Sequence, residues 1–158
     1  MSRGTARLAL VTDVRASPDR CFDLSCDLDL HQRAMAASAE HAVGGVTGGM
    51  IGPGQEVTWR SRHFGIWWRV TSRIVEYDRP RRFVDEMRRG PFAAWRHEHR
   101  FEGHGGGTRM VDDVAYRLPL GWLGRSADLL AVHRYLRRLL EIRNRHIKRA
   151  AEGPGAAG

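Results

Sequence analysis

The chain of 158 residues is poor in lysine, in cysteine and in long apolar runs. Its two cysteines, Cys21 and Cys26, lie five residues apart in a predicted helix, a spacing that favours neither a disulfide nor a zinc motif. No run approaches the roughly 18 apolar residues of a membrane span, and residues 1–14 lack the apolar centre of a signal peptide. The composition therefore predicts a protein of the reducing cytoplasm.

Positive charge comes almost entirely from arginine. The formal net charge is +8, and of the 26 basic residues only Lys148 is not an arginine. With 18 glycines, this bias is typical of codon usage as much as of selection for a polyanion. The stretch from Arg125 to Glu152 is strongly basic, but no nucleic-acid motif accompanies it. We expect a solvated helix face and do not expect nucleic acid as a partner; a partner for this basic helix stays a minor alternative.

Short alternating segments are followed by one long amphipathic stretch. Ser17-Pro18-Asp19 predicts a helix start, with Ser17 as the N-cap and Pro18 at the first helical position. Strands followed by a helix long enough to cross them predict an α+β fold, an antiparallel sheet with a helix against one face. The predicted elements are a strand at 6–14, helices at 17–27 and 28–39, turns and short edge strands at 44–54, strands at 56–63, 66–77, 83–89, 95–101 and 108–117, and a helix at 125–151.

The length and the absence of internal repeats predict one domain with one core. We expect this domain to span residues 1–151. The last residues, EGPGAAG at 152–158, have the composition of a disordered tail.

The strand at 95–101 shows by its charges which face is buried. Arginine or glutamate occupies every second position from 96 to 100, and three charges in a row belong in water. His97 and His99 therefore point inward. The following hairpin brings Asp112 opposite one of these histidines, and the preceding strand brings Asp85 beside them, because the turns fix which positions pair.

The spacing of apolar residues in the long helix and in the other strands predicts the rest of the interior. In the long helix, residues at three- and four-residue spacing form one apolar stripe that contains Arg143, which we expect to reach the rim or to pair with an interior carboxylate. The stripe consists of Leu129, Val132, Leu136, Leu139, Leu140, Arg143 and Ile147. The other inward residues are Val57, Trp59, Trp68, Val70, Ser72, Ile74, Met110, Val114 and Tyr116.

Four ionisable groups, Asp85, His97, His99 and Asp112, thus face the interior together. Burying them is costly unless they pair or meet water. They indicate a wet or ligand-filled cavity, with a satisfied buried His–Asp hydrogen-bond pair as the structural alternative. This group is the strongest functional signal in the chain.

The order of the elements resembles the helix-grip proteins of the START, polyketide-cyclase and pollen-allergen superfamily (SRPBCC), in particular bacterial single-domain members. The resemblance covers residues 6–149. It implies a curved antiparallel sheet wrapped around a long C-terminal helix, with two short helices after the first strand and a deep cavity for hydrophobic small molecules. The superfamily has no shared catalytic motif, so it assigns no catalytic residue here. The similar motifs are Ser17-Pro18-x-x-x-Phe22, Ile74-x-x-Tyr77-Asp78-x-Pro80-x-x-Phe83, Gly90-Pro91-Phe92, His97-x-His99-x-Phe101 and Gly107-Thr108-x-Met110-x-Asp112.

Binding of a hydrophobic or aromatic small molecule, lipid-like or polyketide-like, between the sheet and the C-terminal helix is the first functional hypothesis. Aromatic and methionine side chains would supply contact area, and the His/Asp group would fix one polar end. The candidate ligand-binding residues are Trp59, Trp68, Asp85, Met87, Trp95, His97, His99, Met110, Asp112, Tyr116, Leu136 and Leu140.

An enzyme of the polyketide cyclase or aromatase type is the alternative. His97 or His99, oriented by Asp85 or Asp112, could remove a proton beside a carbonyl, which makes these four the candidate catalytic residues.

A metal is a third reading, since His-x-His on a strand puts both imidazoles on one face and a nearby aspartate could complete the ligands. This spacing is common by chance, so we expect no metal and no cofactor. His31, His41 and His133 are expected to be solvated. The sequence leaves open whether the protein forms a homodimer.

Overall fold

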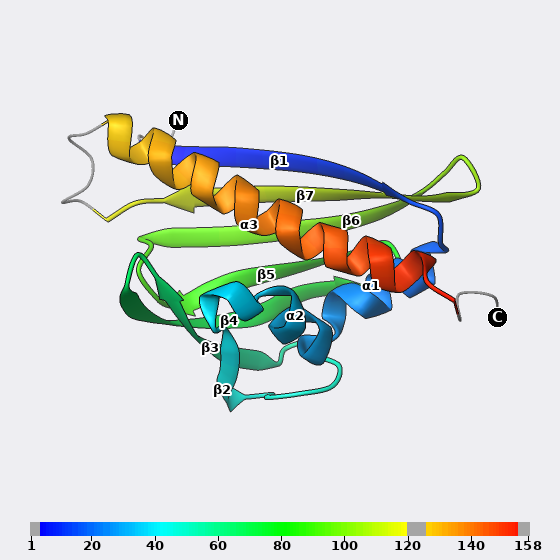
Figure 1. Cartoon of the computed structure of the whole chain (residues 1–158), viewed down its shortest axis with the longest axis horizontal. Helices are drawn as coiled ribbons and strands as arrows, with labels where there is room; N and C mark the ends of the chain where they lie inside the picture. The colour runs from blue at the N-terminus through cyan, green and yellow to red at the C-terminus, as the bar shows by residue number, and fades with distance from the viewer. Residues whose placement is uncertain (1–3, 120–125, 155–158) are drawn as a thin grey trace.

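The computed structural model describes residues 4–119 and 126–154. One antiparallel sheet and one long helix dominate it (Figure 1). The elements are β1 (Thr5–Val14), α1 (Pro18–Cys26), α2 (Leu28–Ala34), the short 3₁₀ helix η1 (Ala36–Ser38), β2 (His41–Gly45), β3 (Glu56–His63), β4 (Ile66–Asp78), β5 (Arg82–Arg89), β6 (Ala94–His104), β7 (Gly107–Arg117) and α3 (Ser126–Glu152).

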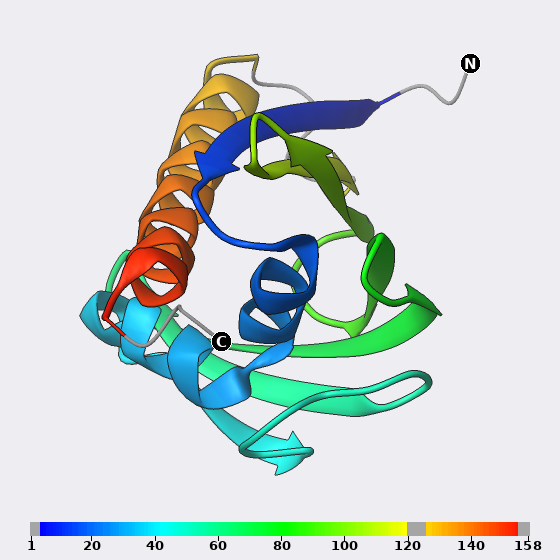
Figure 2. The same cartoon turned by 90° about the vertical axis from the view of Figure 1, so that its right-hand side faces the viewer.

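The seven strands form one sheet in the order β1-β7-β6-β5-β4-β3-β2, with every neighbouring pair antiparallel. The sheet curves strongly, and α3 lies on its concave side while α1 and α2 close one end (Figure 2). This arrangement confirms the predicted α+β helix-grip fold, including the two short helices after the first strand.

The short helices begin at the expected capping residues. The Ser17 side chain accepts a hydrogen bond from the Arg20 amide at 3.3 Å, and Pro18 occupies the first turn of α1. Asp27 ends α1 and caps α2, because its carboxylate accepts hydrogen bonds from the amides of Asp29 and Leu30. The two helices therefore follow each other with a single residue between them.

The second helix ends earlier than predicted. It stops at Ala34 instead of reaching Ala39, because a 3₁₀ turn follows and Ala39 adopts a left-handed conformation with φ of 52°. The Glu40 amide donates back to the Met35 carbonyl, which closes the turn in the manner of a helix C-cap. The chain thereby reverses into β2, so His41 lies in a strand.

The observed register confirms the predicted faces of the strands, whereas Leu129, expected in the apolar stripe of the last helix, is 39% exposed. Across β6 and β7 His99 lies opposite Asp112, and across β5 and β6 Asp85 lies opposite His97. Both histidines are buried, with 5% and 4% of their surface exposed.

The interior consists of two hydrophobic clusters. The first surrounds Phe22 of α1, whose ring packs edge-on against Tyr77, Phe83 and Phe101 at centroid distances of 5.2 to 5.4 Å. We call this the Phe22 cluster. The second, the Tyr116 cluster, joins β1, β7 and the first half of α3, and contains Leu8, Leu10, Val114, Tyr116, Leu118, Leu136 and Leu140.

The last helix extends one residue past the predicted domain end. Glu152 belongs to α3, and its carboxylate accepts a hydrogen bond from the Arg15 amide at 2.8 Å. Most of the predicted disordered tail, residues 155–158, lies outside the described residues, and the single-domain organisation stays a prediction. None of the described helices is both long and apolar enough to cross a bilayer.

Candidate functional site

A layer of polar side chains separates the two hydrophobic clusters. On β7, Asp112 lies between Met110 of the Phe22 cluster and Val114 of the Tyr116 cluster. The same order is found along β1, β6 and α3, so the layer crosses the whole interior. This polar layer consists of Thr12, Asp85, His97, His99, Asp112, Arg143 and Asn144.

Two His–Asp pairs form the centre of the polar layer. The Nε2 atom of His97 lies 2.8 Å from Oδ1 of Asp112, and Nε2 of His99 lies 2.8 Å from Oδ2 of Asp85. The two imidazole rings stack with their centroids 3.6 Å apart, and Phe83 stacks on the other face of His99 at 4.0 Å. Both pairs predicted from the strand alternation are therefore present.

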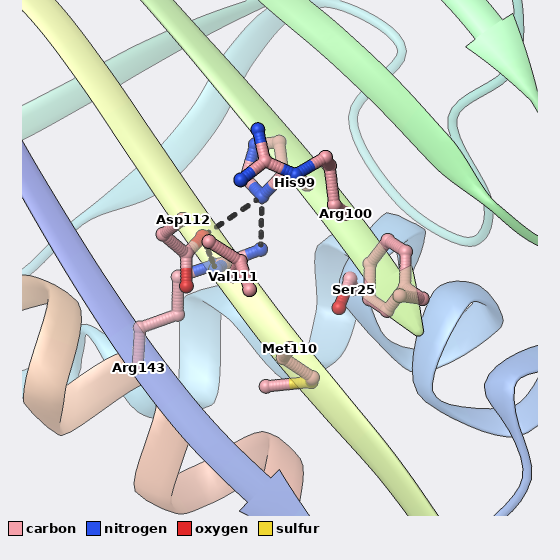
Figure 3. Close-up of a pocket in the computed structure, with 8 residues that line it drawn as sticks. Ser25, His99, Arg100, Met110, Val111, Asp112 and Arg143 are labelled. Carbon is pink, nitrogen blue, oxygen red and sulfur yellow. Dashed lines mark hydrogen bonds and ion pairs between the residues drawn. The ribbon is translucent and has the colours of Figure 1, made fainter. Parts of the chain in front are cut away.

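Asp112 is the hub of this network, and Figure 3 shows its contact with His99 and the Arg143 side chain beside them. Besides His97, its carboxylate contacts His99 Nδ1 at 3.1 Å and accepts hydrogen bonds from Arg143 at 3.3 Å and Asn144 at 2.6 Å. Arg143 is buried, so of the two outcomes expected for it, pairing with an interior carboxylate is the one observed.

Neither Asn144 nor Thr12 was predicted from the sequence as a member of this site. The Asn144 amide donates to Asp112 and to the Thr12 hydroxyl, at 2.6 and 3.1 Å. The sequence does contain a signal for Asn144: position 144 is four residues after Leu140 and three before Ile147, so it falls within the apolar stripe of α3. A polar side chain in such a stripe needs a buried partner.

The network sets the charge of its members. Burial tends to raise the pKa of Asp112, but hydrogen bonds from His97 and His99 and the Arg143 charge outweigh it and hold that pKa well below its usual range. The pKa of Asp85 is likewise lowered, by His99 above all, against the effect of burial. Burial, followed by the neighbouring His99, lowers the pKa of His97. At neutral pH both aspartates are therefore ionised and His97 is neutral.

These charges fix the tautomer of His97. An ionised Asp112 can only accept a hydrogen bond, so the His97 proton is on Nε2 and the Nδ1 lone pair is free. Among the described residues no group hydrogen-bonds to Nδ1, and Oδ2 of Asp85 is 3.9 Å away. His97 thus presents a basic Nδ1, while the hydrogen bond from its Nε2 to Asp112 fixes the orientation of the ring.

Asp85, His97 and His99 could also hold a metal ion, since one donor atom from each lies within 4.8 Å of the others. His99 and Asp85 already satisfy each other by a hydrogen bond, and the Arg143 guanidinium is 3.4 Å from the other nitrogen of His99. A neighbouring fixed cation opposes the binding of another one. The described contacts therefore favour a hydrogen-bonded cluster at this position.

The side of the polar layer that faces α1 is filled. The gap beside His99 and Arg143, lined by Ser25, Phe101 and Met110, is too narrow for a water molecule. The deep cavity implied by the resemblance is therefore not found on this side, because the rings of the Phe22 cluster occupy it. An open cleft of about 280 Å³ approaches the layer from outside, between β1 and α3, beside Asn144.

The inward side chains at the opposite end of the inner sheet face are less completely buried. Trp68, Met87 and Trp95 belong to this face, as their register with inward residues shows, yet each is only half-buried. Trp59 is also half-buried and packs against the Phe22 cluster. The remaining predicted ligand-binding residues, Met110, Tyr116, Leu136 and Leu140, are buried within the two clusters. The binding roles of all of these stay predictions.

Three histidines that were expected to be solvated have partners. His31 is 2.6 Å from Glu40 and stacks on Trp59, and His133 is 3.2 Å from the Tyr116 hydroxyl. His41 contacts the Ala39 carbonyl at 2.8 Å. The expectation was wrong for His31 and His133, whose tertiary contacts could not be seen from local helical spacing, whereas the His41 contact is local and exposed to solvent.

Comparisons with known proteins agree with the architecture. The family model "Polyketide cyclase / dehydrase and lipid transport" matches residues 5–152. The chain belongs to this family. The membership confirms the predicted SRPBCC superfamily and supports hydrophobic-ligand binding or polyketide cyclisation as a general activity. No curated protein sequence matches the chain.

Three solved structures show the same fold at low sequence identity. A protein from Thermus thermophilus has a TM-score of 0.72 and 20% identity, over 94% of this chain and 100% of that one. The ginseng major latex-like protein 151 from Panax ginseng has a TM-score of 0.67 and 15% identity, over 94% and 99%. The di-domain ARO/CYC StfQ of the steffimycin biosynthetic pathway has a TM-score of 0.68 and 15% identity, over 92% of this chain and 50% of that chain.

Proposed function

We propose that this protein binds a hydrophobic or aromatic small molecule, lipid-like or polyketide-like, at this less buried end of the inner sheet face. One observation carries the proposal: Trp68, Met87 and Trp95 face inward and still keep solvent contact. A filled core would bury such side chains completely, as it does at the Phe22 end. Apolar and aromatic side chains around a few polar groups are typical of small-molecule sites.

The polar layer would form the inner limit of this site. His97 is the layer residue next to Trp95 on β6, and its free Nδ1 can accept a hydrogen bond. A ligand with an apolar body and a hydroxyl donor at one end fits this arrangement, because the hydroxyl would satisfy Nδ1. The ligand class is therefore a hydroxylated aromatic or an acyl chain with a polar terminus.

Two consecutive tryptophans provide a matched test. Trp68 belongs to the inner face and Trp67 to the outer face, so replacing each with alanine separates ligand contact from general effects. Titration of the purified protein with hydroxylated aromatics and fatty acids, followed by fluorescence and thermal shift, should give saturable binding. We expect Trp68→Ala and Met87→Ala to weaken it about tenfold, and Trp67→Ala to leave it unchanged. Absence of saturable binding to the native protein would refute the proposal.

Acid–base catalysis is the second candidate, favoured by the neutral, oriented His97. Its Nδ1 would take a proton from a carbon beside a ligand carbonyl and become an imidazolium that Asp112 stabilises. The resulting enolate would attack a second carbonyl of the same chain, and the imidazolium would return the proton to the new alkoxide. In this reading His97→Gln abolishes turnover of a β-polyketone and retains its binding. Unchanged turnover in that variant would exclude His97 as the base.

A further inference from the structure

The hairpin between β3 and β4 carries an exposed apolar tip. Phe64 is 77% exposed, Ile66 56% and Trp67 46%, all within four consecutive positions. We call these three residues the hairpin tip. Clustered large apolar side chains in contact with water indicate an interaction surface, whereas single ones are ordinary. The other large exposed apolar residues of the described chain are Val11, Val43, Met50, Leu129 and Leu130.

The backbone of the turn disfavours the residue at its tip. Phe64 and Gly65 both have positive φ, 53° and 74°, a two-residue turn for which asparagine and glycine are the usual choices. The hairpin between β6 and β7 makes a similar turn with Gly105 and Gly106, at 56° and 78°. A phenylalanine at position 64 weakens the turn and buries little surface, so folding does not account for it.

The tip is held against the long helix. The Phe64 ring lies 4.7 Å from the Tyr135 ring, and the Tyr135 hydroxyl hydrogen-bonds to Nδ1 of His63. The apolar surface is therefore presented by an anchored hairpin. Anchoring lowers the entropy lost when such a surface binds a partner.

Arginines surround Trp67 on its face of the sheet. Arg62 lies opposite Trp67 in the register, Arg60 lies opposite Arg69, and the Arg60 guanidinium is 4.3 Å from the centre of the Trp67 ring. Among the described residues no carboxylate lies within 4.0 Å of these three guanidiniums. Elsewhere on the outer face arginines pair with glutamates, as Arg82, Arg96 and Arg100 do with Glu76 and Glu98.

We propose that the hairpin tip docks on a membrane surface that contains anionic phospholipids. Aromatic side chains favour the interfacial region of a bilayer, and adjacent arginines bind lipid phosphates. Contact of two copies through this patch is disfavoured, because a two-fold axis would bring the three arginines of each copy together. The docking goes beyond the small-molecule site and does not depend on it.

Vesicle co-sedimentation tests the docking directly. The full chain is mixed with vesicles of phosphatidylcholine alone or of phosphatidylcholine with phosphatidylserine, at low and at moderate salt. We expect stronger binding to the anionic vesicles and weaker binding as the salt rises. Arg62→Gln and Arg69→Gln should each lower binding to anionic vesicles about fivefold.

Phe64→Asn separates docking from folding. Asparagine tolerates the left-handed conformation, so this variant should melt no lower than the native protein while binding vesicles about tenfold more weakly. Trp67→Ser should weaken binding similarly. Val11→Ser is the control, because Val11 is 54% exposed on β1, at the far side of the sheet from this hairpin.

Two outcomes would overturn the proposal. One is vesicle binding that is absent, or that is the same for Phe64→Asn, Trp67→Ser and Val11→Ser. The other is a concentration-dependent dimer in size-exclusion chromatography that both hairpin substitutions dissociate, which would assign the patch to a second copy. Neither measurement uses the small-molecule ligand. Failure of the docking proposal therefore does not affect the ligand-binding proposal, which the ligand titration tests separately.

Discussion

His97 hydrogen-bonds to Asp112, although the residue directly opposite Asp112 across the ladder is His99. The crossing is reciprocal: His99 hydrogen-bonds to Asp85, which lies opposite His97. Both diagonal contacts are 2.8 Å, whereas the directly opposed pairs are 3.1 and 3.9 Å apart. Each carboxylate therefore faces both imidazoles, and the four side chains respond to a change in any one of them.

Asp112→Asn should destabilise the fold strongly. The substitution removes the carboxylate that pairs with the buried Arg143, and leaving one partner of a buried ion pair alone costs about 3–5 kcal/mol. Denaturant unfolding would measure the change. Asp113→Asn is the matched control, since Asp113 faces outward and pairs with the exposed Arg7, for an expected cost below about 1 kcal/mol. Equal losses in the two variants would contradict the hub role of Asp112.

Stability should fall in two ranges as the pH is lowered. The pKa of His97 is lowered in the fold, chiefly by burial, so below its unfolded value of 6.5 the unfolded chain takes up a proton that the folded chain does not. The pKa values of Asp85 and Asp112 are also lowered, so their contribution is present above their unfolded value of 3.8 and is lost as the pH falls through the lower folded values.

Urea unfolding from neutral to acidic pH would show both ranges. We expect His97→Gln to flatten the decline that begins near pH 6.5 and to leave a decline at more acidic pH. His41→Gln serves as a control, because His41 is outside the polar layer. A native curve that stays level between pH 7 and pH 5 would argue against the His97 assignment.

Neither cysteine should react in the folded protein. Cys21 and Cys26 are free and almost completely buried, with 0% and 1% of their surface exposed. Burial raises the pKa of the Cys26 thiol to about 12 and also raises that of Cys21, so the reactive thiolate is scarce at neutral pH. A thiol reagent should label neither cysteine in buffer and both in denaturant. Rapid labelling without denaturant would show that α1 opens from the sheet.

The architecture could be predicted from the sequence because the alternation of charges along a strand and the positions of turns are local features of the chain. Alternating charges at positions 96–100 place His97 and His99 inside, and the hairpins then fix Asp85 and Asp112 beside them. The early end of α2 was missed because the left-handed Ala39 carries no glycine or proline signal. Tertiary packing decides such positions.

The interior space could not be predicted in the same way. The sequence shows that the large side chains of Phe22, Phe101 and Met110 are present. How completely they fill the space beneath α3 depends on the curvature of the sheet and on where α1 packs. Alternation also does not show which carboxylate each histidine bonds to, because directly opposed and diagonal partners both lie within reach. Cytoplasmic localisation and oligomeric state stay predictions.

The polar layer has a consequence for how this chain can change over evolutionary time. Because a row of ionic and amide groups separates the Phe22 cluster from the Tyr116 cluster, substitutions in one cluster that do not contact this layer should add independently to substitutions in the other. Substitutions around Trp68, Met87 and Trp95 can reshape the proposed ligand surface while the aromatic cluster around α1 keeps the fold intact. New specificities can therefore arise at one end of the molecule without loss of stability at the other.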